Sequence, residues 1–131
     1  HQYVTFCTFT PAQFAITEML KADPDHIDEL RGFYQQKRDV LVHALKDSRF
    51  KVLPSRGTYF VLVDYSAIST QNDVEFSHWL TQEIGVAAIP LSPFYQAEVL
   101  DEYHQYHKVL RLCFAKNDDT LLQAAEVLCQ L

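Results

Sequence analysis

One arginine, Arg111, stands in a segment that otherwise has the pattern of a buried strand, VLRLCFAK over residues 109–116. The alternation places Leu110, Leu112 and Phe114 on one face and Arg111 on the other. A guanidinium among small apolar side chains needs an anion or acceptors nearby, because an unpaired buried charge is costly. Its planar donors can hold a carboxylate through two parallel hydrogen bonds. The pattern therefore predicts a carboxylate-binding arginine or, as alternatives, a structural ion pair or an edge strand with one face in water.

Other residues that could bind a metal or act in catalysis form no recognisable site. His104 and His107 have the spacing of a ligand pair, but no cysteine or third ligand accompanies them at a zinc spacing. Cys7, Cys113 and Cys129 are odd in number and widely spaced, so we expect reduced core residues and neither a disulfide nor a metal site. No side chain stands in a known nucleophile motif. The residues thus predict no metal ligand and no catalytic base or nucleophile in this chain.

Two other segments attract attention beside the arginine strand. Gly57 lies in a turn, where a glycine lets a backbone approach a ligand closely. We interpret Tyr59 and Phe60, which follow that turn, as core residues. The segment PLSPFY at 90–95 is a loop bounded by prolines. These residues alone predict a carboxylate-binding module and do not specify its function further.

The composition bounds the class of protein. The chain has 131 residues, is 48% hydrophobic and carries 17 acidic against 11 basic side chains, for a formal charge of −6. This acidic balance, without a basic stripe, argues against a nucleic-acid partner. No apolar run approaches the ~18 residues of a membrane span and no signal-peptide pattern opens the sequence, so we expect a cytoplasmic protein without membrane contact. The sequence starts in mid-pattern without Met, and we expect it to be part of a longer chain.

Periodicity and capping residues predict the elements that position Arg111. The expected helices span about 10–21, 25–48, 74–84 and 118–131. The expected strands are 50–53, 58–64, 86–89 and 109–116. Thr10 and Gln13 have the spacing of a capping box, with Pro11 at the first helical position.

The order of these elements predicts the fold class. Strands 50–53 and 58–64 are joined by a Pro/Gly turn and should form a hairpin. Strand 58–64 is apolar on both faces, so we expect a central strand covered on each side. Strands grouped with helices on one side predict a two-layer α+β fold with a small, mainly antiparallel sheet. No linker divides the sequence, which predicts a single domain over 1–131.

Four blocks in order resemble the C-terminal part of fold-type I, class I/II pyridoxal-phosphate aminotransferases. They are HQYVTFCTFTPAQFA (1–15), PSRGTYFVLVDYS (54–66), GVAAIPLSPFY (85–95) and RLCFAK (111–116). Within that family the chain is similar to the methionine and kynurenine/glutamine aminotransferase branch. The resemblance covers nearly the whole sequence.

The resemblance implies a fold, an activity and site residues. Residues 23–131 would form the small domain, with 1–22 linking it to a large domain. The intact protein would be a homodimer that moves an amino group from an amino acid to a 2-oxo acid. Arg111 would bind the substrate α-carboxylate, and Phe6, with Tyr3, would line the side-chain pocket.

The family's cofactor residues do not match positions of this sequence. In the family, the lysine that binds pyridoxal 5'-phosphate and the groups that hold its ring and phosphate precede the segment matching His1. None of the six lysines here stands in the corresponding motif, so we expect the 131-residue chain alone to be inactive. Three alternatives stay open: a carbon–sulfur β-lyase of the same fold type, a stand-alone carboxylate-binding α+β module, and a folded but inert piece.

Overall fold

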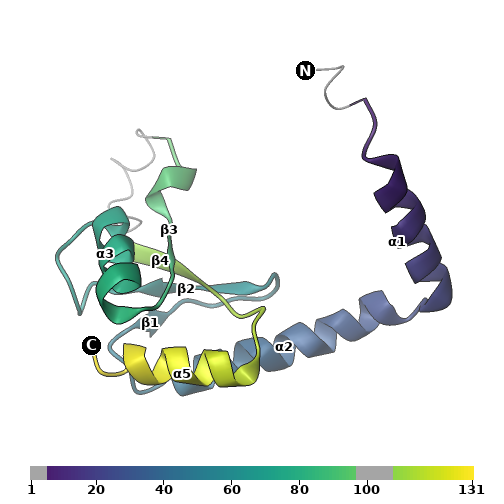
Figure 1. Cartoon of the computed structure of the whole chain (residues 1–131). Coiled ribbons are helices and arrows are strands. Elements are labelled where there is room, and N and C mark those ends of the chain that lie inside the picture. Colours follow the sequence, from purple (N-terminus) through teal and green to yellow (C-terminus); the bar gives the residue numbers. More distant parts are fainter. Residues whose placement is uncertain (1–5, 97–107) are drawn as a thin grey trace. The chain divides into compact units, whose positions relative to one another are not determined.

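The computed structural model describes residues 6–96 and 108–131 (Figure 1). The chain forms two compact units, His1–Phe33 and Tyr34–Leu131. The predicted boundary at residue 22, between a linking segment and a small domain, stays a prediction. Over the described residues, no helix is both long and apolar enough to cross a lipid bilayer.

The first unit contains α1 (Thr10–Ala22) and the start of α2 (His26–Ala44). Pro11 lies in the first turn of α1 but is its second residue and not the predicted first, and the predicted capping box is wrong. Thr10 is already helical, Phe9 is the N-cap without a side-chain cap, and Gln13 Nε2 donates to the Thr8 carbonyl at 2.7 Å. Helix α1 buries none of its residues.

The second unit contains a four-stranded sheet of order β1-β2-β4-β3. Its strands are β1 (Lys51–Val52), β2 (Phe60–Asp64), β3 (Ile89–Pro90) and β4 (Val109–Cys113). Every neighbouring pair is antiparallel, which confirms the predicted sheet type and the hairpin of the first two strands. Strand β3 is shorter than the predicted 86–89 and overlaps it only at Ile89, because it extends to Pro90.

The helices of this unit pack against one face of the sheet. They are the second half of α2, then α3 (Asp73–Trp79), which continues into the π turn η1 (Leu80–Ile84), and α5 (Asp118–Leu128). A buried cluster joins them to the strands: Leu41, Leu45, Phe50, Val61, Val63, Tyr65, Phe76, Leu80, Leu110, Leu112, Phe114, Leu121, Ala125 and Leu128. This arrangement confirms the predicted two-layer α+β class.

The helix ends have local causes. Helix α2 stops at Ala44, before the predicted 48, because the following residues make tighter turns, such as Ser48 N to Leu45 O at 3.1 Å. Asn72 caps α3 by accepting from Glu75 N at 2.9 Å. Gly85 ends η1 with φ +80°, a conformation that glycine adopts without strain.

Tyr65 fixes the junction between β2 and α3. Its ring stacks on Phe76 with centroids 4.1 Å apart, and its hydroxyl donates to the Gln71 carbonyl at 3.1 Å. Burial, with Asp73 nearby, raises the pKa of the Tyr65 phenol well above its ordinary value. The phenol therefore stays neutral and acts as a fixed donor.

The second face of the sheet is only partly covered. Alternation buries Val61 and Val63 of β2 and leaves Phe60, Leu62 and Asp64 half-buried. The prediction that 58–64 is covered on both sides is therefore wrong for the described part of the chain, in which the helices of this unit occupy one face only. The half-covered face is the one that carries Arg111.

Candidate functional site around Arg111

Arg111 lies in the middle of β4, between two neighbouring strands. In the antiparallel register it stands opposite Leu62 of β2 and Ile89 of β3. Directly opposed residues share a face of the sheet. The arginine therefore projects from the half-covered face, with an apolar residue on each side, as the alternation predicts.

Three aromatic rings surround the Arg111 guanidinium. Its carbon lies 4.2 Å from the centroid of the Phe60 ring, 5.8 Å from Phe94 and 6.0 Å from Tyr59. A cation within about 6 Å of a ring is attracted by the ring's electrons. The Phe94 side chain is 63% exposed and Tyr59 47% exposed, so two of these rings border a region open to a ligand.

The guanidinium is left with unused donors. Its Nε atom is buried and has no hydrogen-bond partner among the described residues. Across residues 6–96 and 108–131, the ion pairs found do not include Arg111. The alternative of a structural ion pair thus finds no partner in this part of the chain. A permanently charged side chain with open donors is suited to bind an anion.

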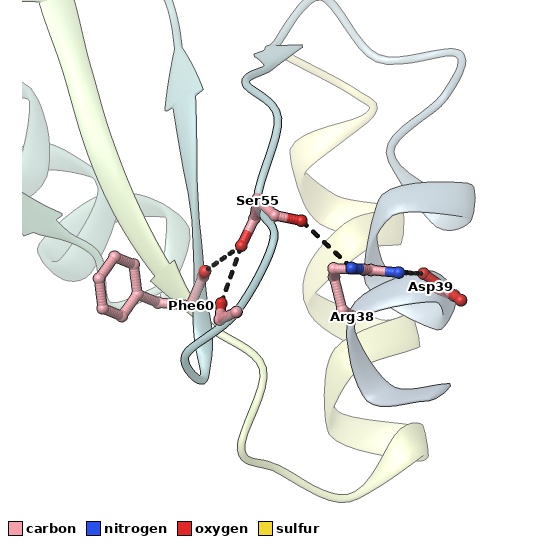
Figure 2. A network of polar contacts seen from close by, with 5 residues as sticks. Arg38, Asp39, Ser55 and Phe60 are labelled. Carbon is pink, nitrogen blue, oxygen red and sulfur yellow. Dashed lines mark hydrogen bonds and ion pairs between the residues drawn. The ribbon is translucent and has the colours of Figure 1, made fainter. Parts of the chain in front are cut away.

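Phe60, whose ring lies against the Arg111 guanidinium, is held by the turn before β2. Figure 2 shows Ser55 between Arg38 and Phe60. The Ser55 hydroxyl lies 3.1 Å from the Gly57 carbonyl oxygen and 3.3 Å from that of Phe60, and it donates to both. Arg38 Nη1 donates to the Ser55 carbonyl at 3.1 Å, while Asp39 holds the same guanidinium at 2.7 Å. The network fixes the backbone at Phe60 from helix α2.

Two expectations about this site are wrong. Tyr59 and Phe60 are not core residues, because β2 begins at Phe60 and its alternation turns that ring to the half-covered face. The cysteines are not buried in the core: Cys7 and Cys129 are exposed and Cys113 is half-buried, although all three are free thiols. Cys113 stands opposite Phe60 on the face of Arg111.

The other predicted site residues lie elsewhere in the chain. Phe6 belongs to the first unit and is 83% exposed. Tyr3, His104 and His107 lie outside the described residues. Among the described residues, no three His, Cys, Asp or Glu side chains are grouped to hold a metal ion.

Sequence reasoning did not connect Phe94 with Arg111. The two residues are far apart in the sequence, and only the pairing of β3 with β4 brings them together. The only signal was the pair of prolines that marks 90–95 as a shaped loop.

The lysines do not fit a covalent cofactor site beside Arg111. Lys21 pairs with Glu18 at 2.9 Å and Lys37 with Asp118 at 2.8 Å. Lys108 donates to the carbonyls of Ser69 and Gln71. The remaining three are exposed: Lys46, Lys51 and Lys116. Ion pairs, contacts with carbonyls and exposure account for all six lysines, so none is assigned to a covalent cofactor site beside Arg111.

Comparison with known proteins gives a consistent picture. The family model described as aminotransferase class I and II matches residues 3–128. The methionine aminotransferase of Escherichia coli (strain K12) is 60% identical over 131 residues, covering all of this chain and 32% of that protein. The kynurenine–oxoglutarate transaminase of Dictyostelium discoideum is 33% identical, covering all of this chain and 34% of that protein.

A solved structure shares the fold. The crystal structure of an E. coli protein, reported with a methionine aminotransferase function, superposes with a TM-score of 0.81 at 57% identity. That similarity covers 100% of this chain and 33% of the other. The chain thus spans about a third of the length of the relatives it matches. Since the family model extends over nearly all of its residues, the chain belongs to the aminotransferase class I and II family.

Proposed function

We propose that the full-length protein containing this chain is an aminotransferase, and that Arg111 binds the α-carboxylate of its substrates. The reaction moves an amino group from an amino acid to a 2-oxo acid. The observation that carries the proposal is the Arg111 guanidinium, which lies over Phe60 with a buried, unpartnered Nε and no carboxylate beside it in the described chain.

The surroundings of Arg111 suit this role. Both an amino acid and a 2-oxo acid carry a carboxylate next to the reacting carbon, and a guanidinium grips it with two parallel hydrogen bonds. The Phe60 ring limits the orientations of the guanidinium, and the apolar neighbours strengthen its attraction for an anion. A substrate held at two points has its reacting carbon fixed in space. Such positioning lowers the activation free energy of the reaction by on the order of several kcal/mol.

The substrate class follows from the relatives and from the apolar site. Relatives named for methionine and for kynurenine match the whole chain. We therefore propose an amino donor that is methionine-like or aromatic/glutamine-like, with Phe6 and Tyr3 lining the pocket for its side chain. The rings of Tyr59 and Phe94 beside Arg111 favour an uncharged side chain.

The cofactor and the assembly are part of the same proposal. Pyridoxal 5'-phosphate, the cofactor that family membership implies, would supply the electron sink for amino transfer. The residues that bind it lie outside this chain, whose lysines are engaged elsewhere or exposed. We further propose a cytoplasmic homodimer.

The test is a pair of substitutions in the full-length protein. Arg111→Ala should lower kcat/KM by roughly a hundredfold or more for every α-amino acid tested, the order expected when one partner of a charged pair is removed. Arg111→Lys should be nearly as poor, because a lysine is a point charge without the planar set of donors. Arg31→Ala, at an exposed position of α2, is the matched control and should keep wild-type kinetics.

The same assay separates the competing activities. Conversion of a 2-oxo acid into its amino acid supports the aminotransferase. Release of ammonia and pyruvate from a cysteine conjugate, without that exchange, would indicate a β-lyase. Unchanged kinetics in Arg111→Ala would remove the assigned role of the arginine.

A further inference from the structure

We propose that Asp73 is a positioning residue, whose buried carboxylate fixes the segment that carries Phe94 beside Arg111. The inference rests on the proposed function, since it concerns the same carboxylate site. It assigns a role to an acidic residue that lies on a different element from the arginine and that no sequence motif singles out.

The contacts of Asp73 are directed to one residue. Its side chain is 1% exposed, in the first turn of α3. Its Oδ2 accepts from the backbone N–H of Ser92 at 2.6 Å, and its Oδ1 accepts from the Ser92 hydroxyl at 2.7 Å. Ser92 is itself buried. Both carboxylate oxygens thus hold one residue of the proline-bounded segment.

Helix capping does not account for this carboxylate. Asn72 already caps α3 by accepting from Glu75 N. Burying a carboxylate is costly unless hydrogen bonds compensate it, and here both compensating donors come from Ser92. The partial positive charge of the helix N-terminus is favourable to Asp73, but an exposed acid would serve it equally well. The burial of Asp73 is explained by the contact with Ser92.

A short rigid path leads from Ser92 to the site. Ser92–Phe94 form the 3-10 turn η2, in which Phe94 N donates to the Leu91 carbonyl at 3.1 Å. Pro93 has a fixed φ, which leaves the turn few alternative shapes. Upstream, Leu91 N donates to the carbonyl of Val109 in β4 at 3.3 Å. Asp73 and Val109 therefore hold the segment at adjacent residues, and the Phe94 ring follows at 5.8 Å from the guanidinium.

Four variants of the full-length protein test the proposal. Asp73→Ala removes both acceptors, and Ser92→Ala removes one donor. Phe94→Ala removes the ring that the contact positions. Asp73→Asn is the conservative variant, because its amide oxygen can accept from Ser92 N–H while its amide donates to the hydroxyl oxygen.

The expected kinetic result is a split between KM and kcat. Asp73→Ala should raise KM for the amino acid about tenfold, the factor for a loss of ~1.4 kcal/mol, with a smaller change in kcat. Phe94→Ala should shift KM in the same direction, Ser92→Ala should lie between Asp73→Ala and wild type, and Asp73→Asn should stay within about threefold of wild type. In the double variant Asp73→Ala/Ser92→Ala, the effects should fall short of their sum.

A second readout needs no activity. Hydrogen exchange followed by mass spectrometry should be faster in peptides covering 91–96 of Asp73→Ala, with peptides from α5 unchanged. A wild-type KM in Asp73→Ala or Phe94→Ala would overturn the proposal. The proposal would also be overturned if Asp73→Asn were as impaired as Asp73→Ala. In that case the negative charge of Asp73, and not its hydrogen bonds to Ser92, would account for the effect.

The two proposals fail in different ways. Normal kinetics in Arg111→Ala would contradict the carboxylate site and, with it, the functional part of this inference. Strong impairment in Arg111→Ala with normal kinetics in Asp73→Ala would leave the carboxylate site in place and reject the role of Asp73.

Discussion

Arg111 combines a permanent charge with a mainly aromatic environment. A cation–π contact contributes on the order of 0.5–2 kcal/mol, less than the hydration a guanidinium gives up on burial. The ring of Phe60 therefore orients the cation without neutralising it. In the role proposed for Arg111, its unsatisfied donors would supply the binding energy for an incoming carboxylate.

This balance predicts the effect of replacing the ring. Phe60→Leu in the full-length protein keeps an apolar side chain under the guanidinium but removes the aromatic face. We expect KM to rise about three- to tenfold, to a similar extent for all amino acids, because they share the carboxylate. Steady-state kinetics with three amino acids of different side chains would measure it.

The matched control is Phe76→Leu in the buried core. Phe76 stacks on Tyr65 and lies away from the face of Arg111. This control should lower the melting temperature and leave KM unchanged. A KM change in Phe60→Leu confined to one amino acid would show that the ring contacts the side chain of the substrate instead.

At the scale of residues, the sequence predicted the position of Arg111 in the sheet but not the side chains that surround it. Alternation along β4 was enough to place Arg111 opposite the core, because side-chain direction in a strand has a period of two. The rings of Tyr59 and Phe94 come from separate segments, and their approach depends on register and turn geometry. The bond from Asp73 to Ser92 spans 19 positions and joins two segments with no shared motif, so no local pattern could reveal it.

At the scale of elements, the turn before β2 contains a strained residue. Thr58 has φ +63°, the only positive φ of a non-glycine among the described residues. A β-branched residue in the left-handed region is costly, and such strain is often found at functional sites. The strain lies next to Tyr59, which borders the guanidinium of Arg111.

Relief of this strain is measurable. Thr58→Gly in the full-length protein should raise the free energy of unfolding by about 1 kcal/mol, since a left-handed L-residue costs roughly that amount or more. Thermal unfolding would measure it. The same change at exposed Thr70, where φ is not positive, should be neutral or destabilising. Stabilisation of equal size at both positions would contradict the explanation.

Most helices and strands could be predicted from the sequence, but their exact ends and local geometry could not. The helices, the hairpin and the central position of β2 followed from periodicity and from Pro/Gly punctuation. The π turn at Leu80–Ile84 has no sequence signature of its own, and the length of β3 depends on how far its partner β4 extends. The apolar second face of β2 suggested a covering layer, and the described residues of this unit do not form one.

At the scale of the whole molecule, both units present apolar side chains to their surroundings. Helix α1 buries no residue, and its Phe14 is 70% exposed. In the second unit, Ile89 and Phe94 are exposed on or beside the face of Arg111. The chain spans about a third of the length of its relatives, so we expect other groups of the full-length protein to complete the proposed carboxylate site.

A cofactor-binding experiment tests this incompleteness. When the 131-residue chain is mixed with pyridoxal phosphate and reduced with borohydride, we expect no stoichiometric attachment to a single lysine. The reason is that its described lysines are ion-paired, bonded to carbonyls or exposed. Peptide mass mapping would detect the label, and the full-length protein treated in parallel should be labelled at one site. One fully labelled lysine in the short chain would contradict the prediction.

The register of β4 also limits which changes in length this region tolerates during evolution. Insertions before Val109 or after Cys113 can be absorbed by connections, and the ladder still presents Arg111 opposite Leu62. A single-residue deletion inside the strand turns every side chain between the deletion and one end of the strand to the opposite face of the sheet. The Arg111 guanidinium would then face the hydrophobic core, and a leucine would take its place on the half-covered face, where we propose that the substrate binds. Lineages that keep the reaction are therefore free to vary their loops but must conserve the count of residues within this strand.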